Sequence, residues 1–138
     1  MPSGWSASAV SDRGRLLVDT SAWIDYFSGD EALVRRLDGP ISDDRIVLCG
    51  QVKQELLQGT RDEKMFAKLE QELSTWQYEG ETAADFLEAA HIYALLRWKG
   101  VTIPASDCLI AAVAKRCGML VCATDPHFEK IPGIRLDK

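Results

Sequence analysis

The sequence lacks any hydrophobic run that could cross a membrane. No apolar stretch approaches the roughly 20 residues that a membrane-spanning helix needs. Residues 1–14 also lack the apolar core of a secretory signal, and their serine, alanine and glycine content predicts a disordered leader. We therefore expect a cytoplasmic protein with no membrane contact, in which residues 15–138 form the folded domain.

Closely paired cysteines and an excess of basic residues are missing too. The four cysteines form no C-x-x-C pair, which disfavours a zinc site and indicates reduced thiols in the core. The net charge of −5 argues against binding nucleic acid through a broadly basic surface. It does not exclude a nucleic-acid enzyme, because carboxylates that hold divalent cations also make a chain acidic.

What the chain does contain is an alternation of short apolar runs with segments of helical periodicity. Strands are predicted over residues 15–19, 45–49, 74–78, 119–123 and 133–136. Helices are predicted over residues 22–27, 31–37, 50–57, 62–73, 82–98 and 106–117. Strands that alternate with helices predict an α/β fold: one three-layer domain with a mainly parallel central sheet, flanked by helices on both faces.

Several local features refine this prediction. Gly39 and Pro40 are expected to end the second helix, since proline breaks a helix interior. In the longest helix, Phe86, Ala90 and Tyr93 are expected to face inward together with Leu95 or Leu96.

Four acids fall near one edge of the predicted sheet. Asp19 ends the first strand, and Asp125 lies two residues past the strand at 119–123. Glu55 is in the helix after the second strand, and Asp107 is in the first turn of a later helix. Because ligands of open parallel sheets bind at the carboxyl ends of the strands, these acids are expected to converge there.

Carboxylates packed that closely repel one another unless a cation neutralises them. Oxygen ligands of this kind suit Mg²⁺ or Mn²⁺, so Asp19, Glu55, Asp107 and Asp125 are candidate metal ligands and catalytic residues. Taken singly, Asp107 could be a first-turn acid favoured by the helix dipole, Asp125 a turn residue and Glu55 a solvated helix acid. The joint pattern favours the metal site.

Four motifs surround these acids. They are Leu-Val-Asp19-Thr20-Ser21-Ala-Trp23-Ile-Asp25-Tyr, Gln54-Glu55-Leu-Leu-Gln-Gly59, Ser106-Asp107-Cys108-Leu-Ile-Ala-Ala and Thr124-Asp125-Pro-His-Phe128. With these motifs the sequence closely resembles the PIN-domain ribonucleases and, within them, the VapC-type toxins of toxin–antitoxin pairs. The resemblance covers roughly residues 16–136.

The resemblance implies a magnesium-dependent endoribonuclease, with Mn²⁺ as the other possible ion. Such an enzyme hydrolyses tRNA or rRNA to 5′-phosphate and 3′-hydroxyl ends. It also implies a homodimer and a cognate antitoxin whose C-terminal segment lies over the acidic site. Thr20 or Ser21 could support that site or could simply be an N-cap of the first helix. No histidine base is required, so His91 and His127 are expected to take no part.

Alternatives from other classes fit less well. A phosphatase of the haloacid dehalogenase kind needs a second Asp two residues after the first, where Ser21 stands. A receiver domain groups its acids before the end of the first strand and keeps a lysine after the last strand. A PIN-fold module that binds RNA or protein without cleaving remains the main alternative.

Overall fold

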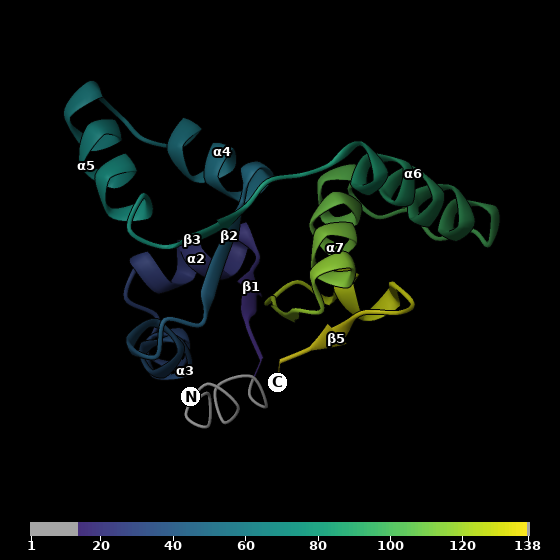
Figure 1. Ribbon diagram of the computed structural model, residues 1–138, viewed down its shortest axis with the longest axis horizontal. Helices are drawn as coiled ribbons and strands as arrows, with labels where there is room; N and C mark the ends of the chain where they lie inside the picture. Colours follow the sequence, from purple (N-terminus) through teal and green to yellow (C-terminus); the bar gives the residue numbers. More distant parts are fainter. Residues whose placement is uncertain (1–13, 138) are drawn as a thin grey trace, which may run out of the picture.

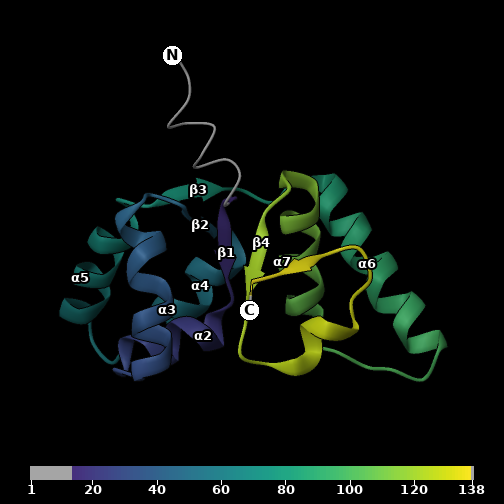
Figure 2. The ribbon, with the colours of Figure 1, turned by 90° about the horizontal axis from the view of Figure 1, so that it is seen from below.

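The structure, a computed structural model, describes residues 14–137, so the predicted leader lies outside the described residues except for Gly14. Its centre is a sheet of five parallel strands in the order β3-β2-β1-β4-β5 (Figures 1 and 2). The strands are β1 (Leu16–Val18), β2 (Ile46–Cys49), β3 (Gln77–Glu79), β4 (Leu120–Cys122) and β5 (Arg135–Leu136). Since every pairing is parallel, the carboxyl ends of all five strands point to one edge.

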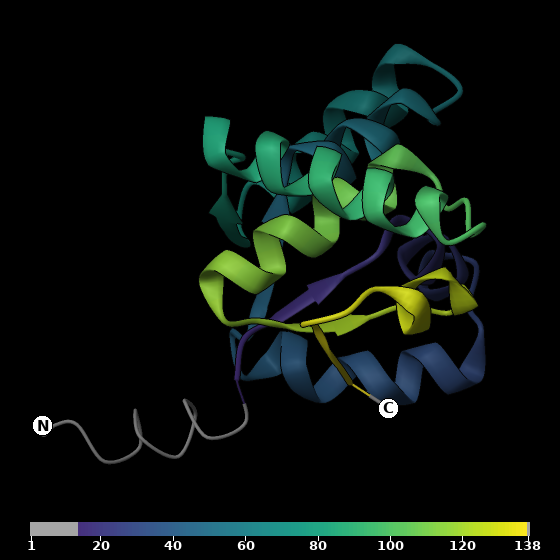
Figure 3. The ribbon, with the colours of Figure 1, turned by 90° about the vertical axis from the view of Figure 1, so that its right-hand side faces the viewer.

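Helices flank this sheet on both sides. They are α2 (Thr20–Phe27), α3 (Glu31–Ser42), α4 (Gly50–Gln58), α5 (Glu63–Leu73), α6 (Ala83–Trp98), α7 (Ala105–Cys117) and the short 3-10 helix η1 (Pro126–Lys130). Figure 3 shows the strands between α7 on one side and α3 on the other. The predicted three-layer α/β fold is therefore confirmed. Within residues 14–137, no helix combines the length and the apolar character that crossing a membrane requires.

The core is built around β1 and α7. All three residues of β1 are fully buried, and α7 buries eight consecutive residues from Asp107 to Ala114. A helix that is apolar on all sides is one that is covered on all sides. Here α6 packs along α7, which itself contacts β4 and η1. Asp107 therefore stands on one of the most firmly enclosed helices of the domain.

The end of α3 differs from the prediction. The helix continues past Gly39 and Pro40 to Ser42, although a proline in a helix interior removes one hydrogen bond. The additional turn packs Ile41 against the core. It also lets the backbone N–H of Arg45 donate to the carbonyl of Pro40 at 2.9 Å. These contacts compensate for the missing hydrogen bond.

Of the residues predicted to face inward on α6, Leu96 is buried and Tyr93 packs against the core, whereas Ala90 is exposed and Phe86, at 57% exposure, points outward. The buried residues of α6 are Asp85, Ala89, Ile92 and Leu96. Asp85 is drawn inward because its carboxylate accepts a hydrogen bond from Arg116 Nε on α7 at 2.9 Å. It also forms a capping box with Thr82. An ion pair between two helices thus sets the rotation of α6.

Candidate metal-binding site

Three of the four candidate acids meet beyond the carboxyl ends of β1 and β4. Asp19 directly follows β1, Asp125 is the N-cap of η1 after β4, and Asp107 lies in the first turn of α7. Asp107, Asp125 and His127 offer ligand atoms that all lie within 4.8 Å of one another. Asp19 is buried, and its negative charge acts on Asp107.

The electrostatics of Asp107 show how crowded this cluster is. Burial raises the pKa of Asp107, the charge of Asp19 raises it further, and together they bring it to about 6 despite an opposing hydrogen bond with His127. The surroundings of Asp107 thus disfavour its ionised, negatively charged form. A divalent cation would reverse this effect, and carboxylate oxygens are the donors that Mg²⁺ and Mn²⁺ prefer. The donor set therefore fits such an ion.

His127 lies between two of these acids, contrary to our expectation that it takes no part. Its Nδ1 is 2.9 Å from Asp125 Oδ1 and 3.2 Å from Asp107 Oδ2. Both neighbours are acceptors, so we assign a proton to Nδ1. The backbone N–H of His127 also donates to Asp125 Oδ1 at 2.9 Å. The sequence held a signal for this backbone contact alone, since an Asp before Pro126 can cap a tight turn.

The two hydroxyl groups after Asp19 bind carboxylates. Helix α2 begins at Thr20, so Asp19 occupies the N-cap position and the alternative of Thr20 or Ser21 as N-cap was wrong. Ser21 Oγ donates to Asp19 Oδ2 at 2.7 Å, and Thr20 Oγ1 donates to Glu55 Oε1 at 2.8 Å. Ser21 Oγ also lies 3.3 Å from Thr124 Oγ1, which links the first turn of α2 to the loop after β4.

Glu55 joins the site through Thr20 rather than directly. Within residues 14–137, its carboxylate accepts from Thr20 and forms no hydrogen bond or ion pair with Asp19, Asp107 or Asp125. Glu55 also lines a cavity of about 560 Å³ between α2, α4 and α5. The apolar part of that cavity is lined by Ile24, Phe27, Leu56, Met65 and Leu69.

The start of α4, which carries Glu55, depends on a residue that sequence reasoning missed. Cys49 occupies the N-cap but makes no side-chain capping bond. Instead the Glu81 carboxylate accepts from the backbone N–H groups of Gly50 at 2.9 Å and Gln51 at 2.7 Å. A Cβ at position 50 would lie 2.7 Å from Glu81 Oε1, so the close approach of this carboxylate requires glycine.

Known proteins resemble this chain in sequence and in fold. The family model of the PIN domain matches residues 16–134. The chain is 35% identical over 127 residues to VapC ribonuclease Mb1587 of Mycobacterium bovis, covering 86% of this chain and 92% of that protein. Ribonuclease VapC11 of Mycobacterium tuberculosis matches with the same identity and coverage. The crystal structure of VapBC2 from Rickettsia felis, bound to a DNA fragment from its promoter, has a similar fold, with a TM-score of 0.75 and 20% identity over 88% of this chain and 96% of that one.

Proposed function

Because this chain belongs to the PIN-domain family, and within it to the VapC ribonucleases, we propose that it is a metal-dependent endoribonuclease and the toxin of a toxin–antitoxin pair. Water attacks the phosphorus of an RNA phosphodiester and the bond to O3′ breaks, which leaves 5′-phosphate and 3′-hydroxyl ends. The observation that carries this proposal is the meeting of Asp19, Asp107 and Asp125 at one edge of the sheet.

We assign to Asp19, Asp107 and Asp125 the binding of Mg²⁺ or Mn²⁺. When bound, such an ion lowers the pKa of a water ligand and offsets the charge that grows on the phosphate. The chain's own side chains set the geometry. Ser21 fixes the Asp19 carboxylate, and Thr20 holds Glu55, which we assign to the ion or to the attacking water.

The proposed antitoxin would cover this acidic site. The apolar cavity that begins at Glu55 supports the proposal, because it offers space for apolar side chains of a partner beside the acids. A partner segment seated there would keep RNA away from Glu55 and its neighbours. Inhibition by the partner should therefore be relieved by a charge placed in the cavity, as in Ile24→Glu.

The outward face of α6 supports the proposed homodimer. Phe86, Leu87 and Trp98 are 57%, 74% and 68% exposed, which is unusual for large apolar side chains on one helix. A second copy that packs against α6 would remove them from water. Sedimentation velocity should then show a dimer for the unmodified chain and a monomer for Leu87→Glu.

Metal dependence gives the most direct test of the enzyme proposal. RNA cleavage by the purified chain should stop in EDTA and return with Mg²⁺ or Mn²⁺, but not with Ca²⁺, whose larger and looser ligand shell fits the reaction poorly. Asp107→Asn should lower the rate on the order of a hundredfold or more. Glu70→Gln, which changes an exposed acid on α5, is the matched control and should retain activity.

Two outcomes would contradict the proposal. Robust cleavage in EDTA would remove the metal from the reaction. RNA binding without cleavage in every metal tested would favour the non-catalytic PIN-fold alternative.

A further inference from the structure

A cavity of about 490 Å³ lies where α6, α7 and α4 meet. Its lining includes Phe86, Ala90 and Tyr93 of α6, Ser106 of α7 and Gln51 of α4. The cavity borders the acidic site through two of these helices. Ser106 directly precedes Asp107 in the first turn of α7, and Gln51 stands one helical turn before Glu55 on α4. A ligand in this cavity therefore neighbours a phosphate bound at the acids.

Three polar side chains of this cavity are open to a ligand. Within residues 14–137, the amide of Gln51 and the hydroxyl groups of Tyr93 and Ser106 form no hydrogen bond with another residue. All three side chains belong to half-buried residues. The backbone of Gln51 is held in place, because its N–H donates to Glu81 Oε2 at 2.7 Å. The cavity thus offers an amide, which both donates and accepts, and two hydroxyl groups.

The remainder of the lining is neutral and partly aromatic. Among the described residues that line the cavity, none is charged. A phosphate or a charged side chain that entered it would therefore meet no opposite charge. Phe86 and Tyr93 lie two turns apart on one face of α6, with the small side chain of Ala90 between them. Two aromatic rings beside unpaired polar groups suit a neutral, flat heterocycle with polar edges, which describes a nucleobase.

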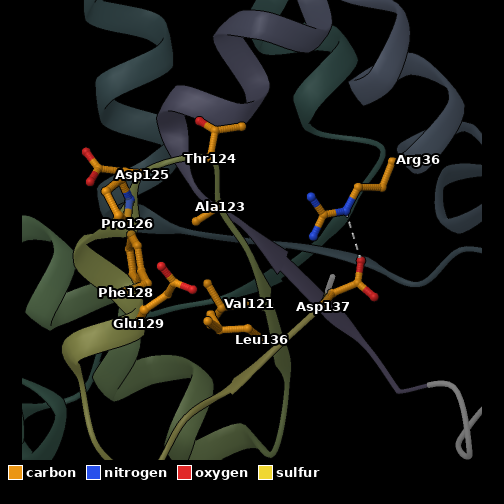
Figure 4. Close-up of a pocket in the computed structure, with 10 residues that line it drawn as sticks. All are labelled: Arg36, Val121, Ala123, Thr124, Asp125, Pro126, Phe128, Glu129, Leu136 and Asp137. Atoms are coloured by element: carbon orange, nitrogen blue, oxygen red, sulfur yellow. Dashed lines mark hydrogen bonds and ion pairs between the residues drawn. The ribbon is translucent and has the colours of Figure 1, made fainter.

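The cavity on the Asp125 side of the acids suits RNA less well. Figure 4 shows that space, which has a volume of about 370 Å³. Its lining includes three acids, Asp125, Glu129 and Asp137, whose charges repel a phosphate backbone. Arg36 Nε is already paired with Asp137 Oδ2 at 3.4 Å (Figure 4). An RNA strand that leaves the acids is therefore expected to run toward α6.

The cavity is also distinct from most of the surface that we assign to a second copy of the chain. Leu87 and Trp98 do not line it. They lie about a third of a turn around α6 from Phe86, which stands at the boundary between the two surfaces. A second copy that packs on Leu87 and Trp98 thus leaves the cavity beside Tyr93 open to RNA.

We propose that this cavity binds the base of an unpaired nucleotide next to the scissile phosphate. The base stacks on Tyr93 and Phe86, and its polar edge forms hydrogen bonds with the Gln51 amide and the Ser106 hydroxyl. The proposal rests on the proposed ribonuclease function. Because every base has a flat face and a polar edge, the cavity gives the enzyme a requirement for an unpaired base at one position rather than for one sequence.

The first test removes bases from the substrate. An oligoribonucleotide that the purified chain cuts at one bond is prepared with an abasic ribonucleotide at each position beside the cut in turn. Loss of the base at one position should raise the KM about tenfold, which is the effect of losing one stacked base. Tyr93→Ala should raise the KM of the intact oligonucleotide to a similar extent and should make that base dispensable. Tyr93→Phe keeps the ring and should keep the requirement.

A second variant guards against a loss of folding, because Tyr93 also packs against the core. Ala90→Leu fills part of the cavity from an exposed helix position, so the domain should fold and the base should again become dispensable. His91→Ala is the matched control. It removes an exposed ring of α6 that does not line the cavity, and it should keep the base requirement.

Two results would overturn the proposal. One is an active chain that cuts the oligonucleotide equally well with each base beside the cut removed. The other is a base requirement that persists in folded Tyr93→Ala and Ala90→Leu. If Ala90→Leu instead shifts the monomer–dimer equilibrium in sedimentation velocity and leaves the base requirement unchanged, the cavity belongs to the contact with a second copy.

The second test locates the base without cleavage. Oligoribonucleotides that carry 4-thiouridine are bound to the Asp107→Asn chain and irradiated with near-ultraviolet light, and the cross-linked peptides are identified by mass spectrometry. The cross-links should fall on Tyr93 or Phe86 and should be lost in Asp107→Asn/Ala90→Leu. Cleavage that depends on no base, with cross-links only outside α6, overturns the base site and retains the ribonuclease function. Cross-links to Tyr93 or Phe86 in a chain whose unmodified form cleaves no RNA do the reverse.

Discussion

At the scale of single residues, Asp107 is where fold and chemistry conflict most. Its position in the first turn of α7 favours a negative charge, because the helix dipole is positive there. Burial and the charge of Asp19 act in the opposite direction and raise its pKa to about 6. The metal-free domain therefore retains a carboxylate that it would be more stable without.

This conflict predicts a pH-dependent stability for the metal-free chain. A folded-state pKa above the unfolded value means that the folded chain binds more protons between the two, so the free energy of unfolding falls as pH rises through about 6. Asp107→Asn removes the charge. In EDTA it should raise the free energy of unfolding on the order of 2 kcal/mol at about pH 7.5, and with it the melting temperature, and change both little at about pH 4.5.

The comparison is made by thermal unfolding in EDTA, with Glu70→Gln as the control. Added Mg²⁺ or Mn²⁺ should stabilise the unmodified chain more than Asp107→Asn, because the cation then meets one ligand charge fewer. A loss of stability in Asp107→Asn at both pH values would mean that the hydrogen bond between Asp107 and His127 is chiefly structural.

At the scale of elements, the clearest dependence is that of α4 on Glu81. The carboxylate arrives from the segment between β3 and α6 and binds the first two backbone N–H groups of α4. It therefore replaces a local N-cap and places its charge at the positive end of the helix. Since α4 carries Glu55, this contact also helps to position a residue of the proposed site.

Glu81→Ala should lower the free energy of unfolding by about 1–2 kcal/mol and also slow RNA cleavage, because a frayed start of α4 displaces Glu55. Asp62→Ala is the matched control. Asp62 caps α5 by accepting from the N–H of Met65 at 2.8 Å, and α5 carries none of the proposed site residues. Chemical denaturation and cleavage assays should show similar losses of stability but a loss of activity in Glu81→Ala alone. Equal activities in the two variants would contradict this positioning role.

Some of the helices and strands could be predicted from the sequence, and others could not. The buried strands and the starts of α5 and α6 follow from apolar runs and from the local caps Asp62 and Thr82. The rotation of α6 does not, because it depends on Asp85 meeting Arg116 on another helix. The continuation of α3 past Pro40 likewise depends on tertiary packing, which outweighs the local preference.

At the scale of the whole molecule, the parallel sheet collects residues that are far apart in the chain. Asp19 and Asp125 could be placed at one edge from the sequence, since carboxyl ends of parallel strands share an edge. The contacts of the His127 side chain could not, because they require the exact path of η1 beside the start of α7. Topology thus predicts where the acids gather, and packing decides which neighbours complete the site.

The last prediction concerns the activity of the whole protein in cells. Expression without a partner should arrest growth, and Asp19→Ala should abolish the arrest. Alanine keeps the backbone N–H that donates to the Cys122 carbonyl at 2.8 Å, so the link between β1 and β4 persists. It also removes a negative charge that repels the ionised Asp107 carboxylate, so the fold should survive.

The proposed metal site would nevertheless lose a rigid ligand, and the cleavage rate should fall on the order of a hundredfold or more. Colony counts are compared at equal amounts of soluble protein, with Glu70→Ala as a control that should stay toxic. If Asp19→Ala still arrests growth while soluble and abundant, the toxicity does not come from RNA cleavage at this site. Binding without cleavage would then account for it better, because binding does not depend on the carboxylate that Asp19 supplies.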